Sequence, residues 1–183
     1  MNWLALIPMR ENSKSLEKKN IRKIFGKPMY EYTLESAINS GAQEVYISTD
    51  ISNVLDKDFK NKKIKTIKRK KYLAKDTTKM EEVIYDFVLY LNEFVSKENK
   101  LIVLLQPTSP LRRSKDIINS LKLFIESNKD LLMSVSKTNN NVLKYGLIEK
   151  DIFIPISKLE YCFQNRQELP SVYKPNGAIY IFN

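Results

Sequence analysis

The sequence contains no histidine and a single cysteine, Cys162. These shortages exclude an intrachain disulfide, the zinc sites built from Cys and His, and every catalytic triad that depends on histidine. Any bound metal is therefore expected to be a hard cation held by oxygen atoms. Glycine is also scarce, with four in 183 residues. The spaced glycines of a GxxxxGK[ST] phosphate loop are missing, and the sequence therefore does not support a P-loop nucleotide site.

Long hydrophobic runs are absent as well. No apolar stretch approaches the roughly 18 to 20 residues that cross a bilayer. The first seven residues are too short, and too uncharged at their start, for a secretory signal. We therefore expect a cytoplasmic protein with no membrane partner.

The chain has enough apolar sequence to build a core. Apolar residues make up 43% and charged residues 28%, which fits one globular domain over residues 1–183 and excludes a disordered or fibrous chain. The 31 Lys and Arg exceed the 21 Asp and Glu, so the formal net charge is +10. A charge of this sign attracts polyanions, and much of it lies in residues 10–27 and 57–75.

Short apolar runs alternate with segments of helical periodicity. Runs rich in β-branched and aromatic residues predict strands, whereas apolar residues at every third or fourth position predict helices. The predicted strands are 3–7, 45–49, 64–67, 101–105, 131–135 and 178–182, and the predicted helices lie around 29–37, 80–95 and 117–125. This alternation predicts an α/β fold with a mainly parallel sheet.

The alternation stops between residues 136 and 175, where successive asparagines, prolines and short apolar fragments replace it. We interpret residues 137–175 as a small arm within the domain. The arm carries more apolar side chains than a short excursion can bury on itself. A second subunit is therefore predicted to cover them.

Two polar loops follow the first and fourth predicted strands, where open α/β sheets bind their ligands. Cations in the first loop, residues 8–20, would neutralise a triphosphate, although a solvated basic loop explains them equally well. Prolines stiffen the second loop, residues 105–113, and its polar side chains offer hydrogen bonds to a base or ribose. A Pro-kinked turn with Ser114 capping the next helix explains this second loop too.

Four segments carry a resemblance to a known family. Their order and spacing resemble those of the acylneuraminate (CMP-sialic acid) cytidylyltransferases, and together they run from residue 7 to residue 182. The segments are IPMRENSKSLEKKNIRKIFGKP, VYISTD, LLQPTSPLRRSKDI and NRQELPSVYKPNGAIYIF. LQPTSPLR and the NRQxLP-to-NGAIYI pair are specific, whereas the basic loop is shared with other sugar nucleotidyltransferases, including the CMP-KDO synthetases.

The resemblance implies a Rossmann-like nucleotidyltransferase fold and a homodimer. It implies a magnesium-dependent reaction in which the anomeric oxygen of a nine-carbon 2-keto sugar acid attacks the α-phosphorus of CTP. The products would be the CMP-sugar, a precursor for lipopolysaccharide, capsule or flagellin glycans, and pyrophosphate. Catalysis would then consist mostly of alignment and charge stabilisation.

Matching the family pattern residue by residue implies the following contacts. The nucleotide would be bound by Arg10, Ser13, Lys14, Lys19, Asn20, Arg69, Asn176 and Gly177, with Arg10 and Lys19 as the catalytic residues. The sugar and ribose region would be lined by Gln106, Thr108, Ser109 and Arg166. An arginine suits the carboxylate of the sugar because its fork binds two oxygens at once.

Some positions depart from the family pattern. Ser15 stands where the family has glycine, Lys79 and Met80 replace serines, and no His-Pro pair opens the arm. The magnesium-binding DxD segment of the family lies downstream of NGAIYI, beyond Asn183. We therefore expect this chain alone to bind CTP weakly and to turn it over poorly.

No metal ligand is assigned within the chain. Asp50 closes the second predicted strand, and a loop or strand-end hydrogen bond explains it better than a metal does. Asp76 is placed similarly, near a predicted nucleotide loop. Magnesium often combines substrate phosphates with one or two carboxylates, and neither aspartate alone makes a convincing site.

Three other interpretations stay open. A different sugar nucleotidyltransferase, such as a CMP-KDO synthetase, would share the fold, although LQPTSPLR and NGAIYIF argue against it. A nucleic-acid-binding domain would use residues 57–75, but only Phe59 and Tyr72 offer stacking there and no RNA or DNA module is recognised, so we expect no nucleic acid partner. A truncated paralogue would bind nucleotide without turnover. Sialic, legionaminic and pseudaminic acids all fit as the sugar.

Overall fold

The computed structural model describes residues 2–12, 16–95 and 100–183. The chain divides into two compact units, one comprising Met1–Ser134 with Gly177–Asn183 and the other comprising Val135–Asn176. The predicted arm, residues 137–175, falls within the second unit. Among the described residues, no helix is both long enough and apolar enough to cross a membrane.

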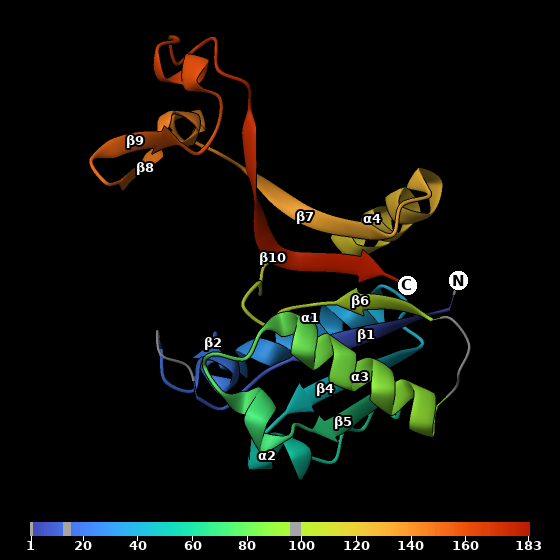
Figure 1. Ribbon diagram of the computed structural model, residues 1–183. Helices are drawn as coiled ribbons and strands as arrows, with labels where there is room; N and C mark the ends of the chain where they lie inside the picture. Colours follow the sequence, from blue (N-terminus) through green and yellow to red (C-terminus); the bar gives the residue numbers. More distant parts are fainter. Residues whose placement is uncertain (1, 13–15, 96–99) are drawn as a thin grey trace. The chain divides into compact units, whose positions relative to one another are not determined.

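The first unit is built on a six-stranded sheet with the order β5-β4-β1-β6-β10-β7. The strands are β1 (Trp3–Pro8), β4 (Glu44–Thr49), β5 (Ile64–Lys68), β6 (Leu101–Leu104), β7 (Leu131–Thr138) and β10 (Val172–Phe182). β1 is parallel to β4 and β6, β4 is parallel to β5, and β10 is antiparallel to β6 (Figure 1). The mainly parallel α/β sheet predicted from the sequence is confirmed.

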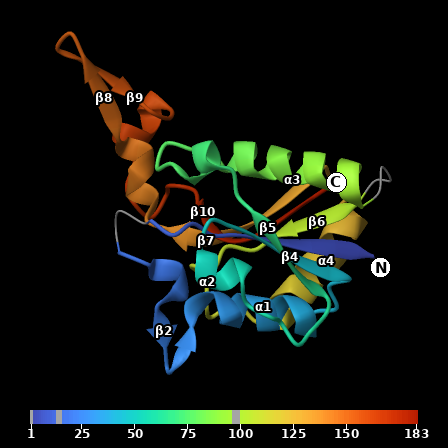
Figure 2. The same cartoon turned by 90° about the horizontal axis from the view of Figure 1, so that it is seen from below.

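Helices cover both faces of this sheet. α3 (Met80–Phe94) packs on one face, whereas α1 (Met29–Asn39) and α4 (Ser114–Ser127) pack on the other (Figure 2). Successive residues of β1 alternate between the two cores, with Leu4 and Leu6 under α3 and Ala5 and Ile7 under the other pair. Burial on both faces explains why β1 is a continuous apolar run.

Some short elements in the first unit had no clear sequence pattern. They are the hairpin of β2 (Lys23–Ile24) and β3 (Lys27–Pro28), the 3-10 turns Lys19–Ile21 and Lys71–Ala74, and α2 (Ser52–Leu55). The hairpin turns through Phe25 and Gly26, which both have positive φ. Pro28 then occupies the N-cap position of α1, where its missing N–H costs no helical hydrogen bond.

The start of α4 corrects one expectation. Ser114 is the first residue of the helix, not its cap. The Asp116 carboxylate accepts a hydrogen bond from the Arg113 backbone N–H at 2.9 Å, and the Asp116 N–H donates to the Arg113 carbonyl at 3.1 Å. These reciprocal bonds satisfy the first turn in place of a serine hydroxyl.

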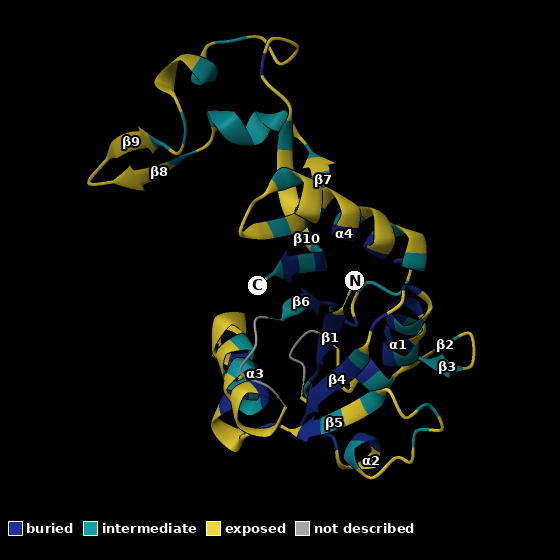
Figure 3. Cartoon of the chain, turned by 90° about the vertical axis from the view of Figure 1, so that its right-hand side faces the viewer, coloured by how far each residue is buried: buried dark blue, intermediate teal, exposed yellow. Residues whose placement is uncertain are grey.

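The second unit is mostly irregular. It contains the antiparallel hairpin of β8 (Gly146–Glu149) and β9 (Ile152–Pro155) and the 3-10 turns Asn140–Lys144 and Leu159–Cys162. Within residues 135–176, which are all described, Leu169 is the only buried hydrophobic side chain. Figure 3 accordingly shows β8 and β9 in the colour of exposed residues. This unit therefore has almost no core of its own.

Candidate active site

A cavity of about 260 Å³ opens in the first unit, beyond the carboxyl ends of β1, β5 and β6. Its walls come from the segments that follow these three strands and from the first turn of α3. The lining residues are Pro8, Met9, Arg10, Lys19, Asn20, Arg69, Leu73, Lys75, Asp76, Thr78, Met80, Val83, Gln106, Pro107 and Thr108. This edge is where open α/β sheets bind ligands.

Six of the predicted site residues meet at this cavity. They are Arg10, Lys19, Asn20, Arg69, Gln106 and Thr108. Ser109 is described but does not line the cavity; its backbone forms the turn that follows Gln106. Ser13 and Lys14, together with the unusual Ser15, lie outside the described residues. The contacts of all these residues with substrate stay predictions.

Two hydrogen bonds hold the segment after β1 in place. The buried side chain of Asn20 donates from Nδ2 to the Arg10 carbonyl at 3.0 Å. The Asp50 carboxylate accepts from the Glu11 backbone N–H at 2.8 Å. Asp50 therefore makes a strand-end hydrogen bond, as expected for it. Both bonds hold the peptide group that joins Arg10 to Glu11, directly after the Arg10 side chain.

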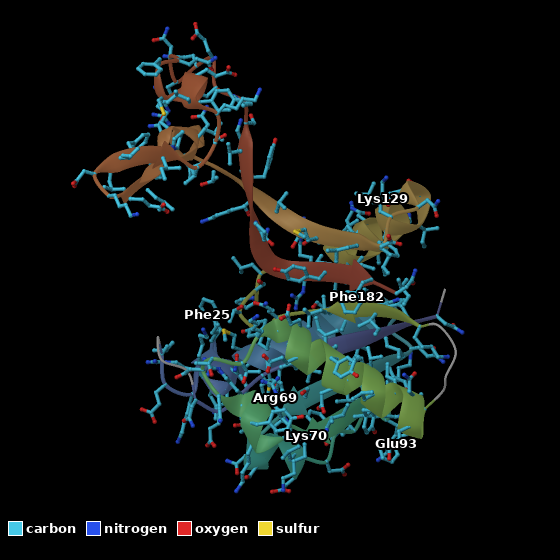
Figure 4. The ribbon with its side chains drawn as sticks, in the orientation of Figure 1. Phe25, Arg69, Lys70, Glu93, Lys129 and Phe182 are labelled. Carbon is cyan, nitrogen blue, oxygen red and sulfur yellow. The ribbon has the colours of Figure 1, made fainter. Side chains whose placement is uncertain are left out.

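The cations that line the cavity, which we call the charge cluster, are Arg10, Lys19, Arg69 and Lys75. Arg69 is the buried member of this cluster, and Figure 4 labels it among the side chains of the first unit. Its Nη2 donates to the Ser48 carbonyl at 2.9 Å and its Nε donates to the Ser48 hydroxyl at 3.3 Å. Burial lowers the pKa of Arg69 to about 10, against the opposing effect of the Asp50 charge. The guanidinium is still charged at neutral pH and is held by neutral oxygens.

Asp76, which the sequence placed near a predicted nucleotide loop without a role, lines the cavity with these cations. Asp76 forms an ion pair with Arg10, and both side chains are partly exposed. Lys75, which the sequence did not place in the site, lines the same cavity. Lys75 ends the basic run 57–75 and Asp76 follows it directly, but no local pattern predicts that Asp76 contacts Arg10 across 66 positions. The cavity thus carries a counter-charge that an incoming polyanion must displace from Arg10.

The two serine replacements occupy different positions at the start of α3. Met80 lines the cavity together with Val83, giving that wall an apolar character. Lys79 lies in the N-cap position and pairs with Glu81 at 3.5 Å. A serine hydroxyl is therefore replaced by a thioether at the cavity wall.

Gly177 and Gln106 approach each other closely. Gly177 has φ +76°, and a Cβ added there would lie 2.9 Å from Oε1 of Gln106 and 3.4 Å from its Cδ. The position requires glycine for its backbone conformation and again for the space taken by the Gln106 amide. Gly177 thus lies against a residue of the cavity wall, and its contact with the nucleotide stays a prediction.

Arg166 and Asn176 belong to the second unit. Arg166 lines a polar cavity of about 410 Å³ with Lys137, Asn139 and Asn140 among its neighbours. Asn176 donates from Nδ2 to the Ser136 hydroxyl at 3.0 Å. That Arg166 and Asn176 help to form the sugar and cytidine pocket stays a prediction.

The carboxylates of the described residues do not by themselves fit a magnesium site. No group of three or more His, Cys, Asp or Glu in that part of the chain is arranged to hold a metal ion. Asp50 accepts a backbone N–H and Asp76 pairs with Arg10. Both carboxylates already have partners, so neither is assigned as a magnesium ligand.

Comparison with known proteins places this geometry in a family. The profile described as Cytidylyltransferase matches residues 4–178. The chain belongs to the cytidylyltransferase family. An N-acylneuraminate cytidylyltransferase from Streptococcus agalactiae serotype III is 32% identical over 187 residues, a match that covers 100% of this chain and 44% of that protein. This chain therefore spans less than half the length of that relative.

Other family members are closer to this chain in length. A CMP-N,N'-diacetyllegionaminic acid synthase from Legionella pneumophila is 30% identical over 189 residues, covering 99% of this chain and 78% of that protein. A solved structure of CMP:2-keto-3-deoxy-manno-octonic acid synthetase complexed with CTP aligns with 100% of this chain and 74% of its own, with TM-score 0.66 and 17% identity. That structural likeness confirms the nucleotidyltransferase fold expected from the resemblance.

The Arg10–Asp76 pair generates a prediction about anion binding. Asp76→Asn should tighten pyrophosphate binding in the absence of divalent cations by about two- to fivefold, because Arg10 no longer has to leave a carboxylate and exposed ion pairs are worth up to about 1 kcal/mol. Calorimetric titration at low ionic strength measures the effect. Asp58→Asn, at an exposed aspartate paired with Lys62, is the matched control. Weaker binding by Asp76→Asn would show that the carboxylate instead supports the anion site.

Proposed function

We propose that this chain, as part of a cytidylyltransferase, binds CTP at the cavity beyond β1, β5 and β6 and transfers its cytidylyl group to a nine-carbon 2-keto sugar acid. The observation that carries the proposal is the convergence of Arg10, Lys19, Arg69 and Lys75 on one cavity of a family member. Four cations against one carboxylate suit a ligand with several negative charges.

The residues that line the cavity have different roles in the proposed reaction. In the proposed reaction the anomeric oxygen attacks the α-phosphorus, and the bond from that phosphorus to the bridging oxygen of pyrophosphate breaks. Negative charge builds up on the departing pyrophosphate, and Arg10 and Lys19 stabilise it. Arg69, held by Ser48, adds a fixed positive charge. Gln106 and Thr108, across the cavity, supply neutral hydrogen-bonding groups to sugar and ribose.

The sugar is proposed to be a sialic-type acid because the relatives named above act, by their names, on acylneuraminate and diacetyllegionaminic acid. Arg166 stays our proposed contact for the sugar carboxylate, since it lines a polar cavity with Lys137. Magnesium remains part of the proposal because triphosphate oxygens are ligands that it prefers. No step is assigned to the ion.

Nucleotide selectivity tests the proposal directly. The protein is expected to bind CTP more tightly than UTP, ATP or GTP in calorimetric titrations under identical salt conditions. Pyrophosphate release is then followed with CTP, magnesium and a panel of sialic, legionaminic, pseudaminic and 3-deoxy-manno-octulosonic acids. Equal affinities for the four nucleotides would defeat the proposal, and release with the octulosonic acid alone would favour the CMP-KDO alternative.

The basic residues generate a second prediction. Arg10→Ala or Lys19→Ala should lower kcat/KM by roughly 30- to 900-fold, about 2 to 4 kcal/mol of transition-state stabilisation, as loss of one preorganised charged donor does elsewhere. Lys122→Ala, at an exposed lysine of α4, removes the same charge far from the cavity and should change nothing. Unchanged turnover in both cavity variants would mean that the loop is solvated surface.

We also propose that the protein is a homodimer in which a second copy covers the second unit. Eleven large hydrophobic side chains of this unit are exposed, compared with its single buried one. They are Val135, Tyr145, Leu147, Ile148, Ile152, Phe153, Ile154, Ile156, Leu159, Phe163 and Tyr173. A 42-residue unit with so little core gains most of its stability from a partner surface.

Sedimentation equilibrium at micromolar concentration tests this dimer. The wild-type protein is expected to have twice the mass of the chain. Ile148→Asp, at a side chain 68% exposed on the hairpin, should shift the equilibrium toward monomer. Leu123→Asp, at a side chain 57% exposed on α4, is the matched control and should leave the mass unchanged. A strictly monomeric wild-type protein would remove the proposal.

A further inference from the structure

Arg112 is a buried arginine that the proposed reaction does not use. It follows β6 by eight residues and is 8% exposed. Its Nη1 donates to the Gln106 carbonyl at 3.2 Å and to the Ala178 carbonyl at 2.5 Å. Its own backbone N–H donates to the Ser109 carbonyl at 3.2 Å. One side chain therefore joins both ends of the loop after β6 to strand β10.

Burying the Arg112 guanidinium costs desolvation free energy that a residue with only a packing role would avoid. Nε and Nη2 of Arg112 are buried, and no residue of the described chain accepts a hydrogen bond from either. Burial also lowers the pKa of Arg112 to about 10, with Asp116 opposing that shift only through its charge. An apolar side chain of similar length would avoid the desolvation penalty. The guanidinium must therefore contribute something that packing alone does not supply.

What it fixes is the backbone that carries Gln106. The Gln106 amide lines the charged cavity and lies against Gly177, whose Cβ would stand 2.9 Å from Oε1. The Thr108 hydroxyl donates to the same Oε1 at 3.5 Å. Arg112 binds the carbonyl of Gln106 and the carbonyl of Ala178, the residue after Gly177. The two backbones that enclose the amide are thus held by a single nitrogen atom.

We infer that Arg112 is a positioning residue, which clasps Gln106 to β10 so that the Gln106 amide keeps one place at the cavity wall. The inference rests on the proposed function only for the identity of the ligands. A rigidly held amide binds its ligand without first being ordered, whereas a displaced one loses alignment. Lysine keeps the charge of Arg112, but its ammonium has freely rotating donors at the end of a flexible stem, whereas the two N–H bonds of Nη1 point in directions fixed by the guanidinium plane.

A double-mutant cycle separates positioning from simple structural support. Arg112→Lys, Gln106→Ala and the double variant are compared for CTP affinity by calorimetry and for kcat and KM with CTP and N-acetylneuraminate. Arg112→Lys should weaken binding or kcat/KM about tenfold when Gln106 is present and less than about twofold when it is absent, because coupled residues are not additive. Arg113→Lys, at the neighbouring exposed arginine paired with Asp116, is the matched control.

Gly177→Ala provides a second approach from the opposite side of the amide. The added Cβ displaces the Gln106 side chain. The loss of CTP affinity that Gly177→Ala causes only when Gln106 is present reports this displacement. Backbone strain at residue 177 lowers affinity equally with and without Gln106. Thermal melts verify that each variant is folded. If Arg112→Lys is too unstable to assay, Arg112→Met, which keeps an unbranched side chain but removes its donors, takes its place in the cycle with Gln106→Ala.

Additive effects of the Arg112 and Gln106 substitutions would overturn the inference and leave Arg112 a purely structural residue. A Gln106→Ala variant with the CTP affinity and kcat/KM of the wild type would also overturn the inference. In either case the effects of Arg10→Ala and Lys19→Ala stand independently, so failure of the clasp is distinguishable from failure of the proposed function.

Discussion

Every group of the candidate site depends on the parallel register of β1 with its two neighbours. Pro8 pairs with Ser48 of β4, and Leu6 pairs with Leu104 of β6. Three further backbone bonds extend the ladders by one residue, from Met9 to Ser48, from Arg69 to Thr49 and from Leu105 to Leu6. The chain therefore leaves β1, β5 and β6 at one edge. A slip by one residue would exchange the two cores and turn these segments away from each other.

The two buried arginines, Arg69 and Arg112, are both held by neutral oxygen atoms. Arg69 is held by the carbonyl and hydroxyl of Ser48, and Arg112 by the carbonyls of Gln106 and Ala178. Neither guanidinium has a hydrogen-bonded carboxylate among the described residues. Oxygen dipoles orient an arginine without cancelling its charge, so the positive potential at Arg69 remains available to a ligand. Arg10 differs, because its partner Asp76 carries a full charge that a ligand can replace.

The sequence predicted the sheet well because burial on both faces makes strands such as 101–105 continuous apolar runs. It predicted Arg10, Lys19 and Gln106 because cations and stiff polar loops after such strands are locally visible, and the family resemblance added Arg69. It did not predict the Arg10–Asp76 pair or the bond from Arg112 to Ala178, which each join residues 66 positions apart. Such contacts arise only when the sheet closes. The cap of α4 was wrong for a different, local reason: the Asp116 carboxylate accepts the Arg113 N–H, and Arg113 is the N-cap of a helix that begins at Ser114.

The Asn20 amide has a consequence for how this site can change. Because it bonds to the Arg10 carbonyl, the two ends of the segment from residue 11 to residue 19 are tied together independently of what lies between them. The entropy of closing a loop grows only slowly with its length. Residues can therefore be added or exchanged between Glu11 and Lys19 at little cost to the placement of Arg10, and this part of the segment offers a place where ligand preference can be redesigned while Arg10 and Arg69 keep their positions.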